Sequence, residues 1–313
     1  MPDGVIVWGG GRWAINYLIA LDNIDKYSGE IHIITSNHNI TDLLKNKVTV
    51  HHDESSLPVN GAFSSIVVNK NLSHERAVAF ALKNNHHILC EKPMMLSPDT
   101  IFAAFQRNIN DNQLFWESML PCYCDYFNYI RLLSQKCNNF ILRWEDPFQD
   151  IPNKAHDLDI TYNQDIIPHA LSIASVLTSL NKNRNSWHIS ELSSFSDYGS
   201  FLITDHNYRF ECNCSRIAEK RVRTITGYYN KELLYSYDFK NEPGHFTEFN
   251  QILKEYLDES VLLCLQENIQ IQKIRPIERQ LYDFIFFNAK KYWIDRPKLS
   301  IHQDIFVSRK KFK

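Results

Sequence analysis

The chain opens with a short apolar run that leads directly into a glycine-rich turn, and this arrangement restricts the fold more than any other feature. Residues 5–8 are apolar, residues 9–14 read Gly-Gly-Gly-Arg-Trp-Ala, and an apolar, helix-like segment follows. In a phosphate-binding turn of the form Gly-x-Gly-x-x-Ala, Gly9 permits the tight bend, Gly11 lets a pyrophosphate approach the backbone, and Ala14 allows close helix packing. Glycine-rich turns also occur simply as turns, but the position between strand and helix favours dinucleotide binding.

The rest of the first third alternates short apolar runs with helix-like stretches. The runs cover residues 31–34, 48–50, 65–68 and 87–90, and a helix over His74–Lys83 precedes the last of them. Continuous apolar strands that alternate with helices indicate a parallel sheet covered on both faces, and right-handed crossovers make such a sheet doubly wound. We therefore predict a Rossmann dinucleotide-binding domain over residues 1–118.

The pattern changes after about residue 116. A strand over 140–144 and a long helical stretch within 160–180 come first. Several longer, more polar strands follow over 187–239, and helices are predicted over 246–265 and 276–291. More polar strands separated by turns indicate an antiparallel sheet that is open on one face. We predict an α+β domain over residues 119–313, whose final helix can pack back on the first domain.

Composition excludes several classes of function. The length of 313 residues is enough for two domains, and the net charge of −2 gives no reason to expect nucleic acid or a membrane as partner. No segment approaches the roughly 20 apolar residues that cross a bilayer, and the N-terminus lacks the features of a signal peptide. The seven cysteines are odd in number and show no disulfide spacing. We therefore expect a cytoplasmic protein.

The chain contains two Cys-x-Cys pairs, Cys122/Cys124 and Cys212/Cys214, which raise the question of a metal site. In a strand this spacing places both thiols on one face, but neither pair has a second Cys/His pair at zinc-like spacing. Ordinary packing is therefore favoured, and we expect no metal.

The end of the second strand bears on the choice of cofactor. Residues Thr35, Ser36, Asn37 and His38 follow it, and none is a carboxylate of the kind that grips the ribose of NAD. Ser36, Asn37 and a suitably protonated His38 can donate hydrogen bonds to the phosphate of NADP. NADP is favoured, and NAD stays an alternative because no arginine is present.

The stretch over residues 65–99 carries a second motif. It reads as a strand, the loop Asn69-Lys70-Asn71, a helix that begins near His74, and a strand that ends in Glu91-Lys92-Pro93. This order resembles the Gfo/Idh/MocA family of NAD(P)-dependent oxidoreductases. With the glycine turn, the resemblance covers about the first 120 residues. Beyond them, only the domain layout and one motif match.

The resemblance implies a role for Lys92. At the carboxyl end of a parallel strand, its side chain enters the ligand crevice, where it can stabilise an alkoxide or relay a proton during hydride transfer. In the family a cis bond before the proline aims the lysine, and Pro93 stands at that position. Taken alone, Glu-Lys-Pro is also a common surface tripeptide.

The matching motif in the second domain is Asp165 with His169. A spacing of four places both on one helical face, so that His169 can act as general acid/base while Asp165 orients it or binds a second hydroxyl. A buried helix histidine beside a carboxylate is the alternative. Ile167 and Ser172 replace the family's glycine and trailing acid, and residues 69–71 replace its Thr-Pro-Asn, so the substrate pocket is altered.

The predicted site comprises two sets of residues. The catalytic set is Lys92, His169 and Asp165. The cofactor set is Gly9, Gly11, Arg12, Trp13, Ala14, Ser36, Asn37, His38, Asn69, Asn71, His74, Glu91 and Lys92.

The resemblance implies hydride transfer between nicotinamide and a small polar carbonyl or alcohol, such as a sugar, a nucleotide-linked sugar or a cyclitol. Two alternatives stay open. One is an imine reductase of a specialised biosynthetic pathway, and the other is a non-catalytic regulatory or scaffold protein of the same fold. The resemblance also implies a homodimer or a dimer of dimers through the C-terminal sheet, to which the aromatic strands over 208–210 and 235–239 could contribute.

Overall fold

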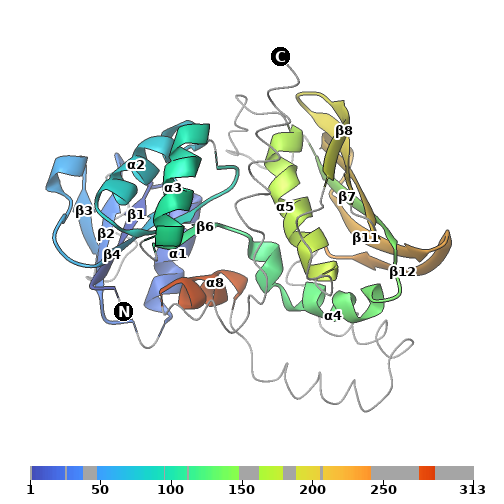
Figure 1. The fold of residues 1–313 in the computed structure, drawn as a ribbon, viewed down its shortest axis with the longest axis horizontal. Coiled ribbons are helices and arrows are strands. Elements are labelled where there is room, and N and C mark those ends of the chain that lie inside the picture. The colour runs from blue at the N-terminus through green and yellow to red at the C-terminus, as the bar shows by residue number, and fades with distance from the viewer. Residues whose placement is uncertain are drawn as a thin grey trace, which may run out of the picture. The chain divides into compact units, whose positions relative to one another are not determined.

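The chain forms two units. The computed structural model describes residues 2–24, 27–37, 48–94, 96–110, 113–147, 162–178, 188–204, 207–240 and 275–285. The first unit contains the described residues up to Met119 together with 275–285, and the second contains those from Leu120 to Lys240 (Figure 1). The helix predicted over 246–265, and the end of the one predicted over 276–291, lie outside the described residues.

The first unit is built on a parallel sheet with the order β3-β2-β1-β4-β5-β6. Its strands are β1 (Gly4–Trp8), β2 (Glu30–Ile34), β3 (Val48–His51), β4 (Phe63–Val67), β5 (His87–Cys90) and β6 (Phe115–Glu117). Every residue of β1 and β4 is buried, as expected for central strands covered on both faces. The predicted Rossmann sheet is confirmed.

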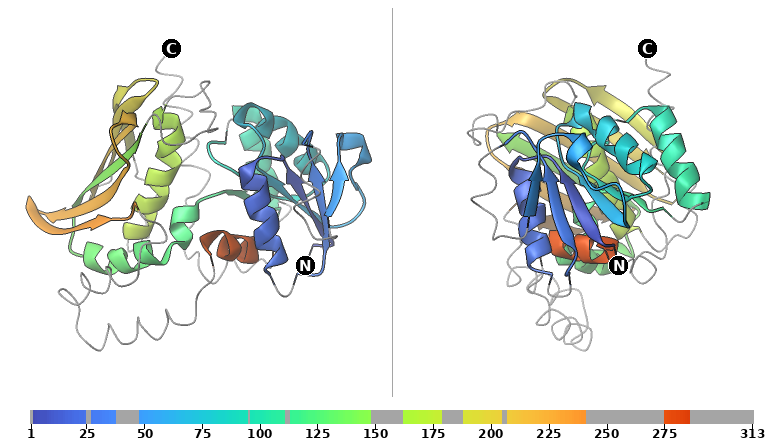
Figure 2. Two further views of the ribbon diagram at one scale, coloured as in Figure 1. Left: turned by 180° about the vertical axis from the view of Figure 1, so that it is seen from behind. Right: turned by 90° about the vertical axis from the view of Figure 1, so that its left-hand side faces the viewer.

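Helices cover both faces of this sheet. They are α1 (Arg12–Asp22), α2 (His74–Lys83), α3 (Pro98–Asn110) and α8 (Pro276–Ile285), with short 3₁₀ turns at η2 (Glu54–Ser56) and η3 (Asn71–Ser73). Helix α2 buries Ala77, Val78 and Ala81 at helical spacing, and it packs with α3 on the face opposite α1 (Figure 2). Helix α8 packs against α1, where Asn23 Nδ2 donates to Glu278 Oε1 over 2.9 Å.

A fully buried histidine lies beneath α2. The His86 ring has no exposed surface, its Nδ1 lies 3.0 Å from Ser65 Oγ, and the Phe63 and Phe80 rings are about 6 Å away. Burial lowers the pKa of His86 to about 4, and the neighbouring His87 contributes in the same direction.

This histidine predicts a stability that depends on pH. The unfolded chain takes up a proton on His86 below pH about 6.5, whereas the folded protein resists protonation down to about 4, so stability falls as the pH drops through that window. We expect a loss of about 2 kcal/mol at pH about 5, measured as the free energy of urea unfolding relative to neutral pH. A His86→Gln variant should lose this part of the pH dependence. An identical pH slope in the two proteins would contradict the prediction.

The second unit is a six-stranded sheet in the order β12-β11-β7-β10-β9-β8, with helices on one face. Its strands are β7 (Asn139–Pro147), β8 (His188–Ser194), β9 (Tyr198–Thr204), β10 (Arg209–Ala218), β11 (Val222–Tyr229) and β12 (Glu232–Asp238). The helices are α4 (Asp125–Ser134) and α5 (Tyr162–Leu177), after the 3₁₀ turn η4 (Leu120–Tyr123). Of the described pairings, β7 with β10 is parallel and the others are antiparallel. The predicted mostly antiparallel, open sheet is confirmed.

The aromatic strands form part of the core of this unit. Phe210 and Phe239 have no exposed surface, Tyr237 is 4% exposed, and the ring of Phe239 lies 5.1 Å from that of Phe127 on α4. Because side chains alternate along a strand, these rings share the face that α4 and α5 cover. These rings therefore belong to the core of the unit, and a contribution of the same strands to an interface through their other face stays a prediction.

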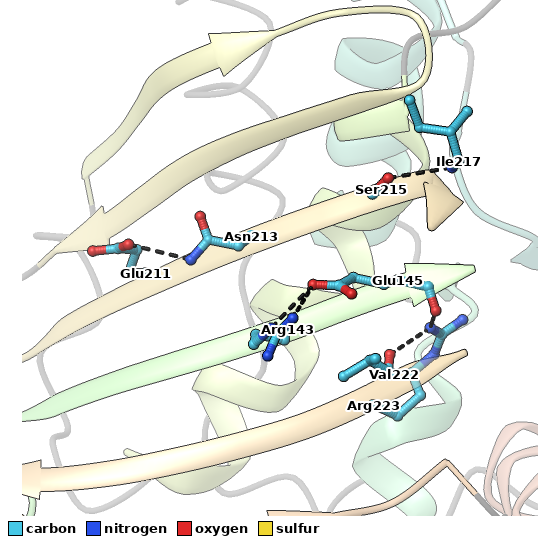
Figure 3. Close-up of polar contacts among 8 residues, drawn as sticks. All are labelled: Arg143, Glu145, Glu211, Asn213, Ser215, Ile217, Val222 and Arg223. Atoms are coloured by element: carbon cyan, nitrogen blue, oxygen red, sulfur yellow. Dashed lines mark hydrogen bonds and ion pairs between the residues drawn. The ribbon is translucent and has the colours of Figure 1, made fainter. Parts of the chain in front are cut away.

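The opposite face of the sheet carries mainly polar side chains. Figure 3 shows Arg143 bonded to Glu145 on β7, and Asn213 bonded to Glu211 on β10. No described helix covers this face. Within the described segments, no helix combines the length and hydrophobicity needed to cross a bilayer.

Candidate active site

Parallel pairing brings the ends of four strands of the first unit to one edge of the sheet. Three backbone amides just past the strand ends donate hydrogen bonds to carbonyl oxygens of the neighbouring strand. These bonds are Gly9 to Ile34 over 3.0 Å, Val68 to Trp8 over 3.0 Å, and Glu91 to Val67 over 2.8 Å. The glycine turn, the residues after β2, the loop after β4 and the Glu-Lys-Pro segment therefore meet at this edge. Strand order reverses at β1, which is where open parallel sheets bind ligands.

The three glycines of the turn differ in what surrounds them. Gly9 has φ +129°, and a Cβ there would lie 3.0 Å from the Val68 carbonyl oxygen. A Cβ on Gly10 would overlap the hydroxyl of Thr35. Among the described residues, a Cβ on Gly11 would meet no atom within 4 Å. The first two glycines are therefore required by the fold, whereas the third leaves open space beside the start of α1.

The start of α1 is suited to an anion. Gly11 is its N-cap and provides no side-chain cap, so the N–H groups of the first turn depend on partners outside the helix. Ala14 is fully buried against the sheet, while Arg12 is exposed and Trp13 is 48% exposed. Helix N-termini of this kind bind phosphate groups through these amides and the helix dipole.

The residues after β2 are held against the glycine turn. Thr35 is buried, and its Oγ1 accepts a hydrogen bond from the Asn37 amide over 2.9 Å. The side-chain Nδ2 of Asn37 donates to the Gly10 carbonyl over 3.0 Å, and Ser36 is exposed. His38 lies outside the described residues. Sequence reasoning missed the contact of Thr35 with Gly10, because nothing local shows which residue faces the middle glycine.

The loop after β4 is braced from within. His74 is fully buried, and its Nε2 donates to the Asn69 carbonyl over 3.0 Å. Asn69 Nδ2 donates to the Ser73 carbonyl over 3.2 Å, whereas Asn69 Oδ1 is buried and finds no hydrogen-bond partner among the described residues. Asn71 is half-buried in η3. Asn69 therefore retains an acceptor at the edge where the predicted cofactor residues gather.

The Glu-Lys-Pro segment is anchored from below by Glu91. Its buried carboxylate accepts a hydrogen bond from Tyr17 Oη over 2.7 Å and lies 3.3 Å from the Lys92 amide. Tyr17 also bonds to Ser118 over 3.0 Å, and Ser118 lies 3.4 Å from Gln280 of α8. Burial raises the pKa of Glu91, and the bonds from Tyr17 and Ser118 oppose this.

Lys92 follows this anchor and is half-buried. The Lys92–Pro93 peptide bond is cis, as the sequence resemblance implies. Glu91 thus holds the backbone of the turn that carries the lysine, and direct contact of Glu91 with a cofactor stays a prediction.

In the second unit, Asp165 and His169 lie in the first half of α5, and both are half-buried. The His169 ring stacks on Trp144 of β7, with ring centroids 4.8 Å apart. Ser172, at the position of the family's trailing acid, is buried and donates to the Pro168 carbonyl over 2.7 Å. Sequence reasoning placed the helical pair but missed Trp144, which belongs to a strand distant in sequence.

Comparison with known proteins supports this architecture. No family model and no curated protein sequence matches the chain. Solved structures do match. UDP-N-acetylglucosamine 3-dehydrogenase GnnA from Acidithiobacillus ferrooxidans has a TM-score of 0.64 at 14% identity, over 91% of this chain and 88% of that one. The likeness establishes the fold.

Two further structures match at a similar level. The WlbA (WbpB) dehydrogenase from Thermus thermophilus, in complex with NAD and UDP-GlcNAcA, has a TM-score of 0.61 at 13% identity, over 76% of this chain and 83% of that one. The scyllo-inositol dehydrogenase from Lactobacillus casei has a TM-score of 0.60 at 13% identity, over 74% of each chain. These neighbours are dehydrogenases, the class that the sequence resemblance indicates.

Proposed function

We propose that this chain is an NAD(P)-dependent oxidoreductase that transfers a hydride between nicotinamide and a small polar carbonyl or alcohol. The observation that carries the proposal is the open space at Gly11, beside the start of α1 and at the sheet edge that also bears Lys92. A scaffold protein would need neither an open anion site nor a lysine at this edge.

The residues at this edge fit a nicotinamide dinucleotide. The turn over 9–14 and the start of α1 would hold its diphosphate. The side-chain oxygen Asn69 Oδ1 supplies a buried hydrogen-bond acceptor. Ser36 and Asn37, with no carboxylate beside them, favour the phosphate of NADP over the bare ribose of NAD. When bound, the cofactor supplies the hydride chemistry.

The chain's own groups handle the substrate. The Lys92 ammonium donates a hydrogen bond to the substrate oxygen, which stabilises negative charge as it develops there. His169 accepts or donates the alcohol proton as general base or acid, and Asp165 orients it or binds a second hydroxyl. Because these groups only donate hydrogen bonds or transfer protons, the direction of reaction follows from the redox state of the bound cofactor.

The names of two solved neighbours support a proposal for the substrate class. GnnA is named for UDP-N-acetylglucosamine, and another neighbour is named for scyllo-inositol. They support a sugar, a nucleotide-linked sugar or a cyclitol for this chain. Ile167 and the buried Ser172 depart from the family's motif, so the substrate contacts next to His169 differ from the family's.

Parallel fluorescence titrations with NADPH and NADH test the proposal. We expect saturable binding, tighter for NADPH, followed by turnover with at least one member of a panel that contains UDP-N-acetylglucosamine, inositols, free sugars and a cyclic imine. Binding of neither nucleotide by the folded protein would overturn the proposal in favour of a scaffold role. Turnover of the imine alone would identify an imine reductase.

We further propose that the polar face of the second sheet pairs two copies into a homodimer or a dimer of dimers. The face carries Arg143, Glu145 and Glu211, whose opposite charges are suited to self-complementary pairing around a two-fold axis (Figure 3). Sedimentation equilibrium measures the assembly directly, and a monomeric mass at micromolar concentration would refute this arrangement.

A further inference from the structure

The imidazole of His169 lies flat against an aromatic ring of the sheet. Its centroid is 4.8 Å from that of Trp144, and the two ring planes differ by 12°. A small angle at this distance is a stacked arrangement, which restricts rotation of the imidazole about its otherwise broad χ2 torsion. His169 comes from α5 and Trp144 from β7, so the contact joins the helix to the sheet within the second unit.

Trp144 in turn contacts a buried cation. The Arg223 guanidinium carbon lies 4.1 Å from the Trp144 ring centroid, and the two residues are direct cross-strand partners in the β7/β11 register. Guanidinium groups stack on indole rings through cation–π attraction and planar contact. The Phe239 ring meets Trp144 edge-on at 6.0 Å and limits its movement further.

Arg223 is itself fixed by oxygen atoms. Its side chain is 3% exposed, and its Nη2 donates to Asp146 Oδ1 over 2.6 Å. Its Nη1 donates to the backbone carbonyls of Glu145 and Val222 over 2.6 and 2.9 Å (Figure 3). Bonds from a charged donor to a carboxylate and to carbonyls in a buried site are strong and directional. The guanidinium plane is therefore held in one orientation.

The same carboxylate also ties down the helix that carries His169. Asp146 Oδ2 accepts a hydrogen bond from Tyr162 Oη over 2.6 Å, and Tyr162 is the first residue of α5. Burial raises the pKa of Tyr162, with Asp146 as the next cause, so its hydroxyl stays a proton donor. Asp146 thus fixes both the arginine that contacts Trp144 and the first turn of α5.

We propose that Trp144 and Arg223 are positioning residues that fix the imidazole plane of His169 for proton transfer. The catalytic consequence rests on the function proposed above, whereas the geometry does not. An imidazole held in one plane presents its ring nitrogens in one direction, and loss of such alignment is costly even when every catalytic group is retained.

The geometry can be tested without a substrate. In protein with ¹³C-labelled histidine rings, the His169 signals are assigned by their loss in His169→Gln. Stacking on an indole predicts that these ring protons resonate upfield. Trp144→Leu should remove the upfield shift and Trp144→Phe should retain part of it. Wild-type His169 protons at ordinary positions would overturn the proposal.

Arg223→Met is expected to move the same signals, because Trp144 loses the cation that it contacts. Arg143→Met is the control, since Arg143 lies on the same strand as Trp144 and pairs with Glu145 over 2.8 Å on the polar face of the sheet (Figure 3). This control should leave the His169 shift in place. Equal changes in both variants would mean that loss of any ion pair of the sheet disturbs His169, which contradicts a specific role for Arg223.

Turnover supplies the second readout. With a substrate found in the panel, Trp144→Leu should lower kcat about 100-fold with little change in KM, and Trp144→Phe should recover much of the loss. Full activity in a folded Trp144→Leu protein would overturn the proposal. If Trp144→Leu fails to fold, Trp144→Phe and Arg223→Lys give the same readouts. If the His169 signal is upfield but the protein turns over no substrate of the panel, the proposed function is refuted while the stacking of His169 on Trp144 is confirmed.

Discussion

A Lys92→Met variant is expected to lose about a thousandfold in kcat, with a much smaller loss of affinity for NADPH. Methionine keeps the length of the side chain and removes its charge and its donors. The Lys92–Pro93 turn is held through Glu91 and Tyr17, so its backbone should stay in place in the variant. The loss should therefore appear mainly in the chemical step, and much less in cofactor binding.

The measurement combines steady-state turnover of the panel substrate with nucleotide titration of the same preparations. Lys83→Met is the control, because Lys83 is exposed at the end of α2 that lies away from the site. It should match the wild type in both assays. Full turnover by Lys92→Met would show that Lys92 has no part in the reaction, and would favour a role outside catalysis for this chain.

A Gly11→Val variant is expected to fold normally and to bind NADPH at least about 100-fold more weakly, equal to about 2.7 kcal/mol of binding free energy. Apart from the chain neighbours, no atom of the described residues lies within 4 Å of the position of a Cβ on Gly11, so the protein leaves room for the Cβ of the valine. It does fill the space beside the first turn of α1, which a diphosphate would need.

Gly10→Ala is the control in which the added side chain does collide with the protein. Its methyl group would overlap the Thr35 hydroxyl, which is buried and bonded to the Asn37 amide. We expect this variant to lose about 1–3 kcal/mol of folding stability by chemical denaturation. If Gly11→Val binds NADPH as tightly as the wild type, the open space at Gly11 is not where the diphosphate binds. Unfolding of the variant would instead contradict the presence of room for a side chain at Gly11.

Elements whose pattern is local were predictable from the sequence. The bounds of α2 and β5 agree with prediction, because four buried apolar residues at helical spacing define α2 and a continuous run of three apolar residues defines β5. Helix α3, strand β6 and helix α4 were not anticipated. Strand β6 has three residues and lies at the edge of the sheet, so it carries little pattern of its own.

The aromatic strands of the second unit show what an alternating pattern leaves undecided. Alternation in β10 and β12 correctly indicated strands with an aromatic face. A face of alternating rings looks the same in sequence whether a helix of the same chain or a second copy covers it. Packing against α4 and α5 decided that Phe210 and Phe239 are core residues.

The sequence by itself determined the residues whose relation is set within one element or one turn. The glycine turn before α1, Lys92 at the end of β5, and Asp165 with His169 on α5 follow from spacings of a few residues. The tertiary structure alone decided what surrounds them: Thr35 against Gly10, Tyr17 under Glu91, and Trp144 with Arg223 beneath His169. These contacts join elements far apart along the chain. Their partners are chosen by strand order and helix packing, which no local pattern of residues encodes.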